Sequence, residues 1–172
     1  MVDGVAPRAF TREDILGILD SVMDPEVPVL SVRELGIVRD VSVDSSGAVI
    51  VTVTPTYSGC PAIAVIEADI ISAIRTAGVA DVLVRTVYAP AWTTDWIPPE
   101  ARAKLKAYGI APPLRTDSPG DLVQLLRVRP SVQCPYCDSY ETETRSEYGS
   151  TACKAVCWCR ACRQPFELFK SI

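Results

Sequence analysis

Histidine is absent from this 172-residue sequence, and its absence excludes several kinds of functional site. Without an imidazole there is no histidine general base, no Ser-His-Asp or Cys-His nucleophile pair, and no histidine ligand for a metal ion. An excess of basic residues is also lacking, because 17 Lys and Arg face 21 Asp and Glu and leave a formal charge of −4. General binding of nucleic-acid phosphates needs the opposite balance, so we expect no nucleic-acid partner.

Long apolar runs are missing as well. None approaches the ~18 residues that a membrane-spanning helix needs, so we expect no membrane partner. The first ten residues contain Asp3, Pro7 and Arg8 and no apolar stretch, which is not the pattern of a secretion signal. With 48% apolar and 22% charged residues, the composition is that of an ordinary folded protein, which we expect to be cytoplasmic.

Cysteine is plentiful by contrast, and six of the seven cysteines lie between positions 134 and 162. Cys134 and Cys137 form one Cys-x2-Cys pair, and Cys159 and Cys162 form another. A two-residue gap lets one tight turn aim two thiolates at the same ion, and two such turns complete a tetrahedral site. So short a module buries too little apolar surface to fold alone, so the metal would supply folding free energy. We therefore predict a β zinc ribbon with a structural zinc ion.

Two further cysteines, Cys153 and Cys157, are not needed for that site. The simpler interpretation is that they are small buried hydrophobic residues. The alternative is a second thiolate pair, or exchange into the first site to hold a labile ion or an iron–sulfur cluster. All-thiolate ligands suit zinc and iron–sulfur clusters alike, although the spacing of the two pairs favours zinc.

The remainder of the chain alternates between helical and β patterns. Two segments have apolar residues at helical spacing, and three are rich in β-branched residues. In chain order they are 11–23 (helix), 37–44 and 48–54 (strands), 61–78 (helix) and 79–89 (strand). This order predicts a compact α-β-β-α-β domain of the α+β class, with its helices on one face of a small sheet.

Proline and glycine divide the chain into two predicted modules. A short helix near residues 100–108 ends at a glycine, and a stretch rich in proline follows it. We therefore expect the α+β domain over residues 10–110, a linker over 111–130, and the ribbon over 131–172.

Cys60 stands apart from the other six cysteines. It precedes Pro61 at the predicted N-cap of the second helix, where free backbone N–H groups and the helix dipole would stabilise a thiolate. A lowered pKa would make Cys60 a nucleophile, or a ligand for a metal or sulfide. The alternative is a buried capping residue without chemistry, and the residue pattern leaves both open.

Asp24 and Glu26 flank Pro25 and also allow two interpretations. An Asp-Pro-Glu segment usually ends a helix and supplies a capping carboxylate. Alternatively, the two carboxylates approach Cys60 in the folded protein and act as hard ligands or proton acceptors.

Three segments resemble the small domain of iron–sulfur cluster assembly factors. They are Asp24-Pro-Glu26, Val-Arg-Glu-Leu-Gly-Ile-Val at 32–38, and Thr-Pro-Thr-Tyr-Ser-Gly-Cys-Pro at 54–61. In that family the cysteine and the two acids are the proposed metal-site residues. The resemblance therefore implies a transient site for a metal or a cluster at Cys60, Asp24 and Glu26.

Three further segments resemble the PaaD family (also called PaaJ), a subunit of phenylacetyl-CoA epoxidase in bacterial phenylacetate catabolism. They are Trp92-Thr-Thr-Asp-Trp96, Tyr-Gly-Ile-Ala-Pro-Pro at 108–113, and Gly-Ser-Thr-Ala-Cys-Lys-Ala at 149–155. The last segment contains Cys153, which makes it a possible additional thiol of the site. Cys157 stands where the family has an aromatic residue, so the resemblance gives it no role.

The resemblance implies an accessory protein that is not the catalytic subunit. In the epoxidase the chemistry belongs to a diiron subunit and to a flavin and iron–sulfur reductase. This sequence has no Glu-x-x-His diiron motif, and no Gly-x-Gly-x-x-Gly fingerprint for a nicotinamide or flavin.

Three hypotheses on function remain open at this point. In the first, Cys60 helps to mature or deliver the iron or iron–sulfur cofactor of the oxygenase, while the ribbon docks on an oxygenase or reductase subunit. In the second, the protein is a stoichiometric structural or regulatory subunit without metal transfer, and Trp92 and Trp96 are either partner anchors or core residues. The third, a nucleic-acid-binding ribbon, conflicts with the charge. A lone thiolate with two carboxylates is an incomplete ligand shell, which leaves room for a homodimer.

Overall fold

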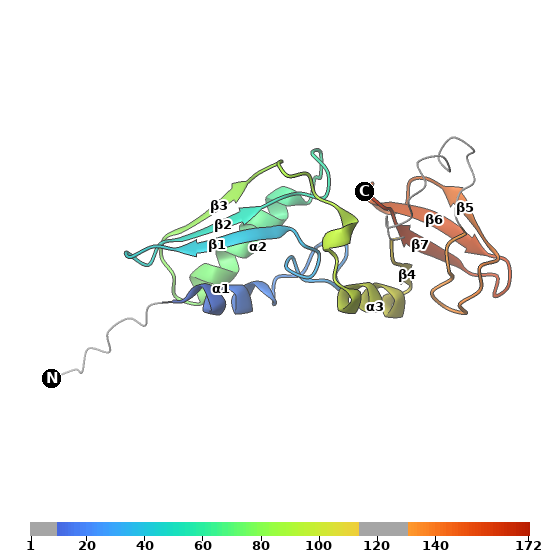
Figure 1. Cartoon of the computed structure of the whole chain (residues 1–172), viewed down its shortest axis with the longest axis horizontal. Helices are drawn as coiled ribbons and strands as arrows, with labels where there is room; N and C mark the ends of the chain where they lie inside the picture. Colours follow the sequence, from blue (N-terminus) through green and yellow to red (C-terminus); the bar gives the residue numbers. More distant parts are fainter. Residues whose placement is uncertain (1–9, 114–130) are drawn as a thin grey trace.

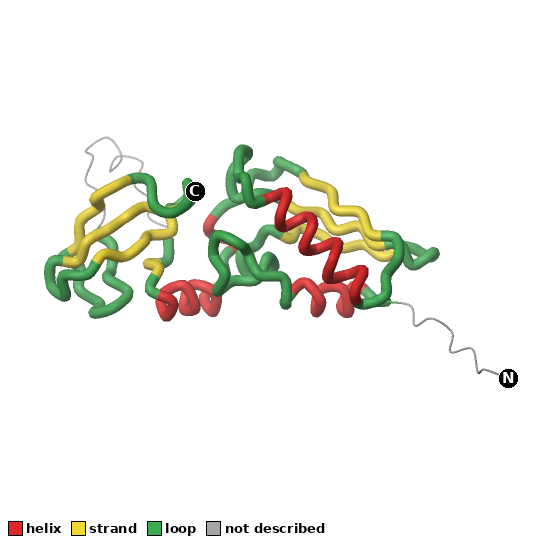
Figure 2. Tube along the Cα trace, turned by 180° about the vertical axis from the view of Figure 1, so that it is seen from behind, coloured by secondary structure: helices red, strands yellow, loops and turns green. Residues whose placement is uncertain are grey.

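The computed structural model describes residues 10–113 and 131–172. The first range contains a three-stranded sheet and two helices that cover one of its faces, as Figures 1 and 2 show. The elements are α1 (Arg12–Leu19), β1 (Val38–Val43), β2 (Val49–Val53), α2 (Ile63–Thr76) and β3 (Val82–Thr86). β1 and β2 form an antiparallel hairpin, and β3 pairs with β2 in parallel. The predicted α+β class and the α-β-β-α-β order are confirmed.

Regularly spaced apolar side chains attach these elements to one core. Ile66, Ile70 and Ile74 follow one another every four residues on α2, and all three are buried. Residues at this spacing lie on the same face of a helix, which here is the face toward the sheet. α1 begins with a capping box, in which the Asp14 N–H donates to the Thr11 hydroxyl and the Thr11 N–H donates to the Asp14 carboxylate.

The first helix is shorter than the sequence predicts. It ends at Leu19 and not at Met23, because the backbone of Met23 forms a β-bridge with Ser31. The Val32 N–H also donates to the Val22 carbonyl, at 2.9 Å. Pairing with a later segment therefore replaces the last helical turn, and sequence periodicity does not reveal such a partner.

The second helix also begins later than predicted, at Ile63 and not at Pro61. Its N-cap is Ala62, which has helical backbone angles and no capping side chain. Cys60 lies in a preceding turn, in which its N–H donates to the Tyr57 carbonyl at 3.1 Å. The predicted position of Cys60 at the helix N-cap is therefore wrong.

The second sheet has four strands and draws one of them from the end of the first range. These strands are β4 (Ile110–Ala111), β5 (Thr142–Ser146), β6 (Lys154–Cys159) and β7 (Pro165–Phe169), in the spatial order β4-β7-β6-β5. β4 follows α3 (Pro99–Tyr108) after Gly109, whose φ of 93° favours glycine. Ala111, the first residue of the predicted linker, therefore lies in a strand that pairs with β7. Residues 114–130 of that linker lie outside the described residues.

The two sheets share buried residues where they meet. Phe169, at the end of β7, and Cys153, in the turn before β6, belong to the hydrophobic cluster of the first region. Trp92 lies in the same cluster, with its ring centroid 6.1 Å from that of Phe169 and its indole N–H donating to the Leu35 carbonyl. The ribbon has a second, smaller cluster of its own, made of Ala111, Val132, Cys134, Cys157, Cys159 and Phe166.

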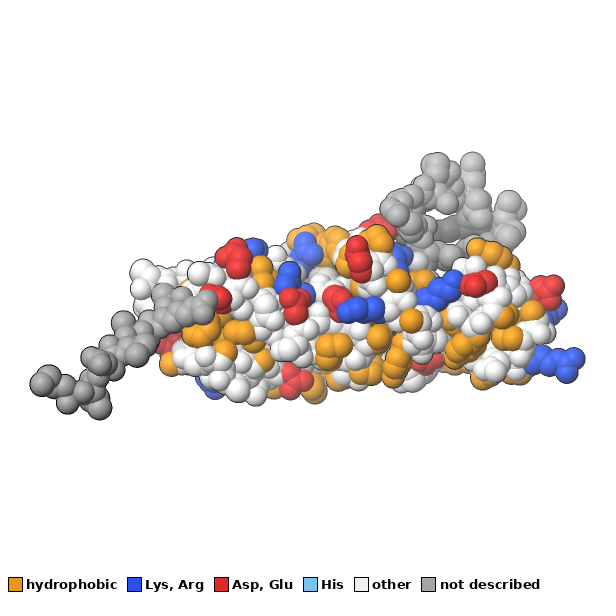
Figure 3. Space-filling view, turned by 90° about the horizontal axis from the view of Figure 1, so that it is seen from below, with side chains coloured by type: hydrophobic (Ala, Val, Ile, Leu, Met, Phe, Trp, Pro, Cys, Tyr) orange, Lys and Arg blue, Asp and Glu red, His pale blue; other side chains and the backbone are white. Residues whose placement is uncertain are grey.

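On the face of the molecule in Figure 3, acidic and basic side chains alternate and form no patch of one sign. Oppositely charged side chains pair at the surface, as Arg33 does with Asp20 at 2.6 Å and Lys104 with Glu34 at 2.5 Å. Within the described ranges, every helix is too short or too polar to cross a membrane.

Candidate metal sites

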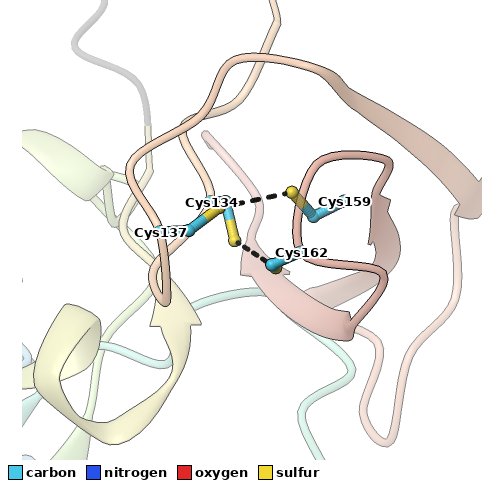
Figure 4. A group of neighbouring side chains, drawn as sticks. All are labelled: Cys134, Cys137, Cys159 and Cys162. Atoms are coloured by element: carbon cyan, nitrogen blue, oxygen red, sulfur yellow. Dashed lines mark hydrogen bonds between the residues drawn. The ribbon is translucent and has the colours of Figure 1, made fainter.

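Four thiols of the ribbon face one another across two tight turns (Figure 4). Cys134 and Cys137 flank and enter the turn before β5, whereas Cys159 ends β6 and Cys162 lies in the turn between β6 and β7. The sulfur atoms of Cys134 and Cys162 are 3.7 Å apart, and those of Cys137 and Cys159 are 3.6 Å apart. All four sulfur atoms lie within 4.8 Å of one another.

This arrangement fits a tetrahedral zinc ion. With Zn–S bonds of about 2.3 Å, the sulfur atoms of such a site are separated by about 3.8 Å. Each turn also ends in the same way, because the residue after the second cysteine, Asp138 or Arg163, has a φ near +60°. The left-handed residue turns the chain sharply after each pair of cysteines.

The four thiols also shift one another's pKa values. A hydrogen bond from the backbone N–H of Cys162 lowers the pKa of Cys159 to about 7. Burial among the other thiols raises the pKa of Cys162 to about 12. Four thiols this close cannot all ionise unless a cation shares their charge. The residues present therefore suit a structural zinc ion.

A second group of metal-ligand side chains meets at the junction of the two regions. Asp24, Glu26, Cys60 and Cys153 line one small cavity of about 10 Å³, together with apolar side chains. The apolar part of the wall includes Val27, Leu35, Ile37, Ile63, Ile66 and Phe169. This second group is looser than the ribbon cluster, since among the described residues the ribbon thiols alone lie close enough together to surround a metal ion.

Asp24 shapes the loop that carries Glu26. One Asp24 carboxylate oxygen accepts hydrogen bonds from the N–H groups of Glu26 and Val27, at 2.8 and 2.7 Å. Only 4% of Asp24 is exposed, and this burial raises the pKa of its carboxyl group. Burial and the nearby Asp24 charge likewise raise the pKa of Glu26. Asp24 is thus both the turn-forming carboxylate and part of the cavity wall.

Cys60 lines this cavity, and its surroundings raise the pKa of its thiol. Burial raises the pKa of the Cys60 thiol, and the N–H of Ala62 offsets this only in part. The negative charges of Glu26 and Asp24 raise it further. The helix N-terminus therefore does not lower this pKa below its usual value, because Cys60 lies before the helix and beside two acids.

The structure brings Cys153 from the ribbon to the same place. Its sulfur atom lies 3.7 Å from a Glu26 carboxylate oxygen and 3.0 Å from the Thr151 hydroxyl. Only 3% of Cys153 is exposed, and burial raises its pKa to about 11. The next residue, Lys154, is also buried, and its amino group donates to the Glu26 carbonyl at 3.2 Å.

Tyr57 lies near the cavity but does not line it. Burial and the nearby Cys60 thiol raise the pKa of its phenol, and the charges of Glu26 and Cys153 act in the same direction. Its phenol is therefore close enough to Cys60, Glu26 and Cys153 to sense their charges. In the sequence, Tyr57 belongs to the segment at 54–61 that resembles cluster assembly factors.

Other candidate residues lie elsewhere. The Cys157 thiol is buried in the ribbon's own cluster, 3.9 Å from the Thr144 hydroxyl, which agrees with its interpretation as a small hydrophobic residue. Trp92 is 3% exposed and is a core residue, so it is not a surface anchor. Trp96 is half-buried, and the guanidinium of Arg39 lies 3.5 Å from its ring centroid.

Comparisons with known proteins agree with this two-part construction. The family model "Iron-sulfur cluster assembly protein" matches residues 12–84, and the model "PaaD zinc beta ribbon domain" matches residues 118–170. A protein of Escherichia coli (strain K12) that is ascribed to 1,2-phenylacetyl-CoA epoxidase as one of its subunits is 45% identical to this chain over 92% of both. The chain belongs to the PaaD family.

Shorter relatives of this PaaD protein match its first region. A protein of Porphyromonas gingivalis named as an Fe-S protein maturation auxiliary factor is 38% identical over 55% of this chain and 90% of its own length. The crystal structure of a domain of unknown function (DUF59) from Bacillus anthracis superimposes with a TM-score of 0.52 at 28% identity, covering 55% of this chain and 90% of that one. These matches support an accessory role.

Proposed function

We propose that this protein matures or delivers the iron or iron–sulfur cofactor of a phenylacetyl-CoA epoxidase, as an accessory component without catalysis of its own. The observation that carries the proposal is the junction cavity, where the thiol of Cys60 meets the carboxylates of Asp24 and Glu26. Thiolate and carboxylate together suit borderline metals such as iron. The names of the relatives, a component of the epoxidase and an Fe-S maturation factor, point to the same task.

In this proposal the two sites have different tasks. The four ribbon cysteines hold zinc permanently, since all four ligands are thiols and leave no open position. The junction cavity takes its cargo only in passing, because its ligand atoms are less tightly gathered. The ribbon surface would then bind an oxygenase or reductase subunit. We place this binding in the cytoplasm.

The test is a complementation experiment in cells that lack the native protein. With Cys60→Ala we expect epoxidase activity and the iron content of the purified oxygenase to fall, while the variant keeps its zinc and its thermal stability. Cys157→Ala is the matched control, since it removes another buried thiol from a different cluster.

The competing function is a stoichiometric structural or regulatory subunit. Normal iron loading of the oxygenase in the Cys60→Ala strain, with the variant still co-purifying at fixed stoichiometry, would favour that function and refute delivery. In this alternative Trp92 and Trp96 could contact the partner, but Trp92 is buried and cannot do so.

A further inference from the structure

One wall of the junction cavity is supplied by the ribbon region. Cys153 and Phe169 line it opposite residues of the first region, and both are buried. Cys153 ends the turn before β6, and its carbonyl accepts a hydrogen bond from the Lys170 N–H at 2.9 Å. The second thiol of the cavity is thus fixed by the ribbon sheet, far along the chain from Cys60.

We propose that the cavity holds a single divalent metal ion, ligated by the thiolates of Cys60 and Cys153 and by the carboxylate of Glu26. This inference rests on the proposed function and specifies its cargo as one ion in place of a cluster. Two thiolates and one carboxylate suit iron(II), which accepts both kinds of ligand. Each thiol gives up its proton on binding, so two protons leave for each ion bound.

The size of the cavity is the reason for a single ion. A space of about 10 Å³ has room for about one water-sized particle. The smallest cluster contains two irons and two bridging sulfides, and is normally held by four protein ligands. The Cys153 sulfur atom, already 3.7 Å from the Glu26 carboxylate, leaves no such room.

Asp24 acts beside this site as a positioning residue. One of its carboxylate oxygens is already occupied by two backbone N–H groups of the Glu26 loop. Lys154 fixes the same loop from the ribbon side, through the Glu26 carbonyl, and pairs with Glu167 at 3.0 Å. Both contacts hold Glu26 against Cys153.

Access to the ion is from the Glu26 side. Glu26 lines a second, open cleft of about 420 Å³, together with Tyr108, Tyr136, Lys154 and Glu167. The Glu26 carboxylate therefore borders both spaces. Three protein ligands also leave a tetrahedral ion one open position, which a ligand of the receiving protein can take.

The experiment uses the full chain with zinc retained, purified without oxygen and titrated with cobalt(II). Thiolate ligands give cobalt(II) a near-ultraviolet charge-transfer absorption that grows with the number of thiolates. Zinc analysis shows that the ribbon is not exchanged. The wild type is compared with Cys60→Ser, with Cys153→Ser and with the control Cys157→Ser.

We expect one cobalt per chain in the wild type and in Cys157→Ser. In each of the other two variants the absorption should fall to about half, and the affinity should fall by about 10–100-fold or more, the range seen when even an outer-shell partner is lost. X-ray absorption at the cobalt edge of the wild type should count two sulfur ligands, which keeps the test valid if a variant folds poorly.

Two results would overturn the inference and leave the proposed function standing. One is a wild-type spectrum with a single sulfur ligand that Cys153→Ser does not change. The other is uptake of iron and sulfide in equal amounts on reconstitution, which would mean a cluster. Failure of delivery itself is a separate result, read from the iron content of the oxygenase in cells carrying Cys60→Ala.

Discussion

The ribbon collects four thiols within 4.8 Å of one another, whereas the junction cavity combines two thiols with two carboxylates in a looser arrangement. In the ribbon each pair of ligands comes from a single turn, and the two turns lie at neighbouring strand ends. In the junction cavity the ligands come from a loop after α1, a turn before α2 and the turn before β6. The first site is therefore determined locally, and the second exists only where the two regions pack together.

This difference suits the ribbon site to permanent binding of its ion and the junction cavity to exchange of its ion. A closed shell of four thiolates gives up its ion slowly and stabilises the fold around it. A partly polar cavity with raised pKa values for Cys60, Cys153, Asp24 and Glu26 keeps its groups neutral more readily when it is empty. Such a cavity can release an ion without leaving two thiolates behind, because both thiols take up a proton again.

Removal of zinc should have the largest effect. Structural zinc contributes on the order of 10–16 kcal/mol to folding in small zinc modules, so Cys134→Ser should unfold the ribbon. Hydrogen exchange should then show loss of protection in β5, β6 and β7, with the amides of α2 still protected. Cys157→Ser should keep both zinc and protection, and a ribbon that stays protected without zinc would contradict the comparison.

Phe169→Ala should have the next largest effect, because Phe169 connects the two regions. A fully buried Phe replaced by Ala costs about 3–5 kcal/mol of unfolding free energy, which urea denaturation measures. Trp92 fluorescence should also change, since the two rings are neighbours.

The matched control is Phe166→Ala, which lies in the ribbon's own cluster. It should also destabilise the ribbon but leave the Trp92 emission unchanged. If both variants change the Trp92 emission equally, then Phe169 is not the specific contact between the two regions.

Asp24→Asn should have the smallest effect, and its sign depends on pH. Burial raises the pKa of Asp24 above 3.8, so its charged form costs stability at neutral pH. Asn keeps the acceptor for the Glu26 and Val27 N–H groups and removes the charge. The variant should therefore be more stable than the wild type above the folded-state pKa, and the difference should vanish below pH 3.8, where both states of the wild type are protonated.

Urea denaturation at a series of pH values tests this sign. Asp24→Ala is the control, because it removes the acceptor as well and leaves two N–H groups without their partner, at a cost of about 1–3 kcal/mol. A wild type more stable than Asp24→Asn at pH 7 would show that the charge is compensated in the folded protein.

The sequence by itself determined the parts of this protein that depend on short spacings. The two Cys-x2-Cys pairs specify a ribbon, because two residues are the gap that one tight turn needs. Ile66, Ile70 and Ile74 specify a helix, since four residues return to the same face. The assignment of Cys60, Asp24 and Glu26 to one site came from a resemblance to a family and not from spacing.

Only the tertiary structure determined which segments of the chain lie next to one another. The end of α1 and the start of α2 were predicted wrongly, because a strand-like contact of Met23 and a turn at Cys60 override local preference. The inclusion of Cys153 and Phe169 in the junction cavity depends on how the ribbon sheet packs on the first region. The spacing of apolar residues shows which face of a helix or strand is apolar. Which element covers that face depends on how the elements pack and how much apolar surface they bury together.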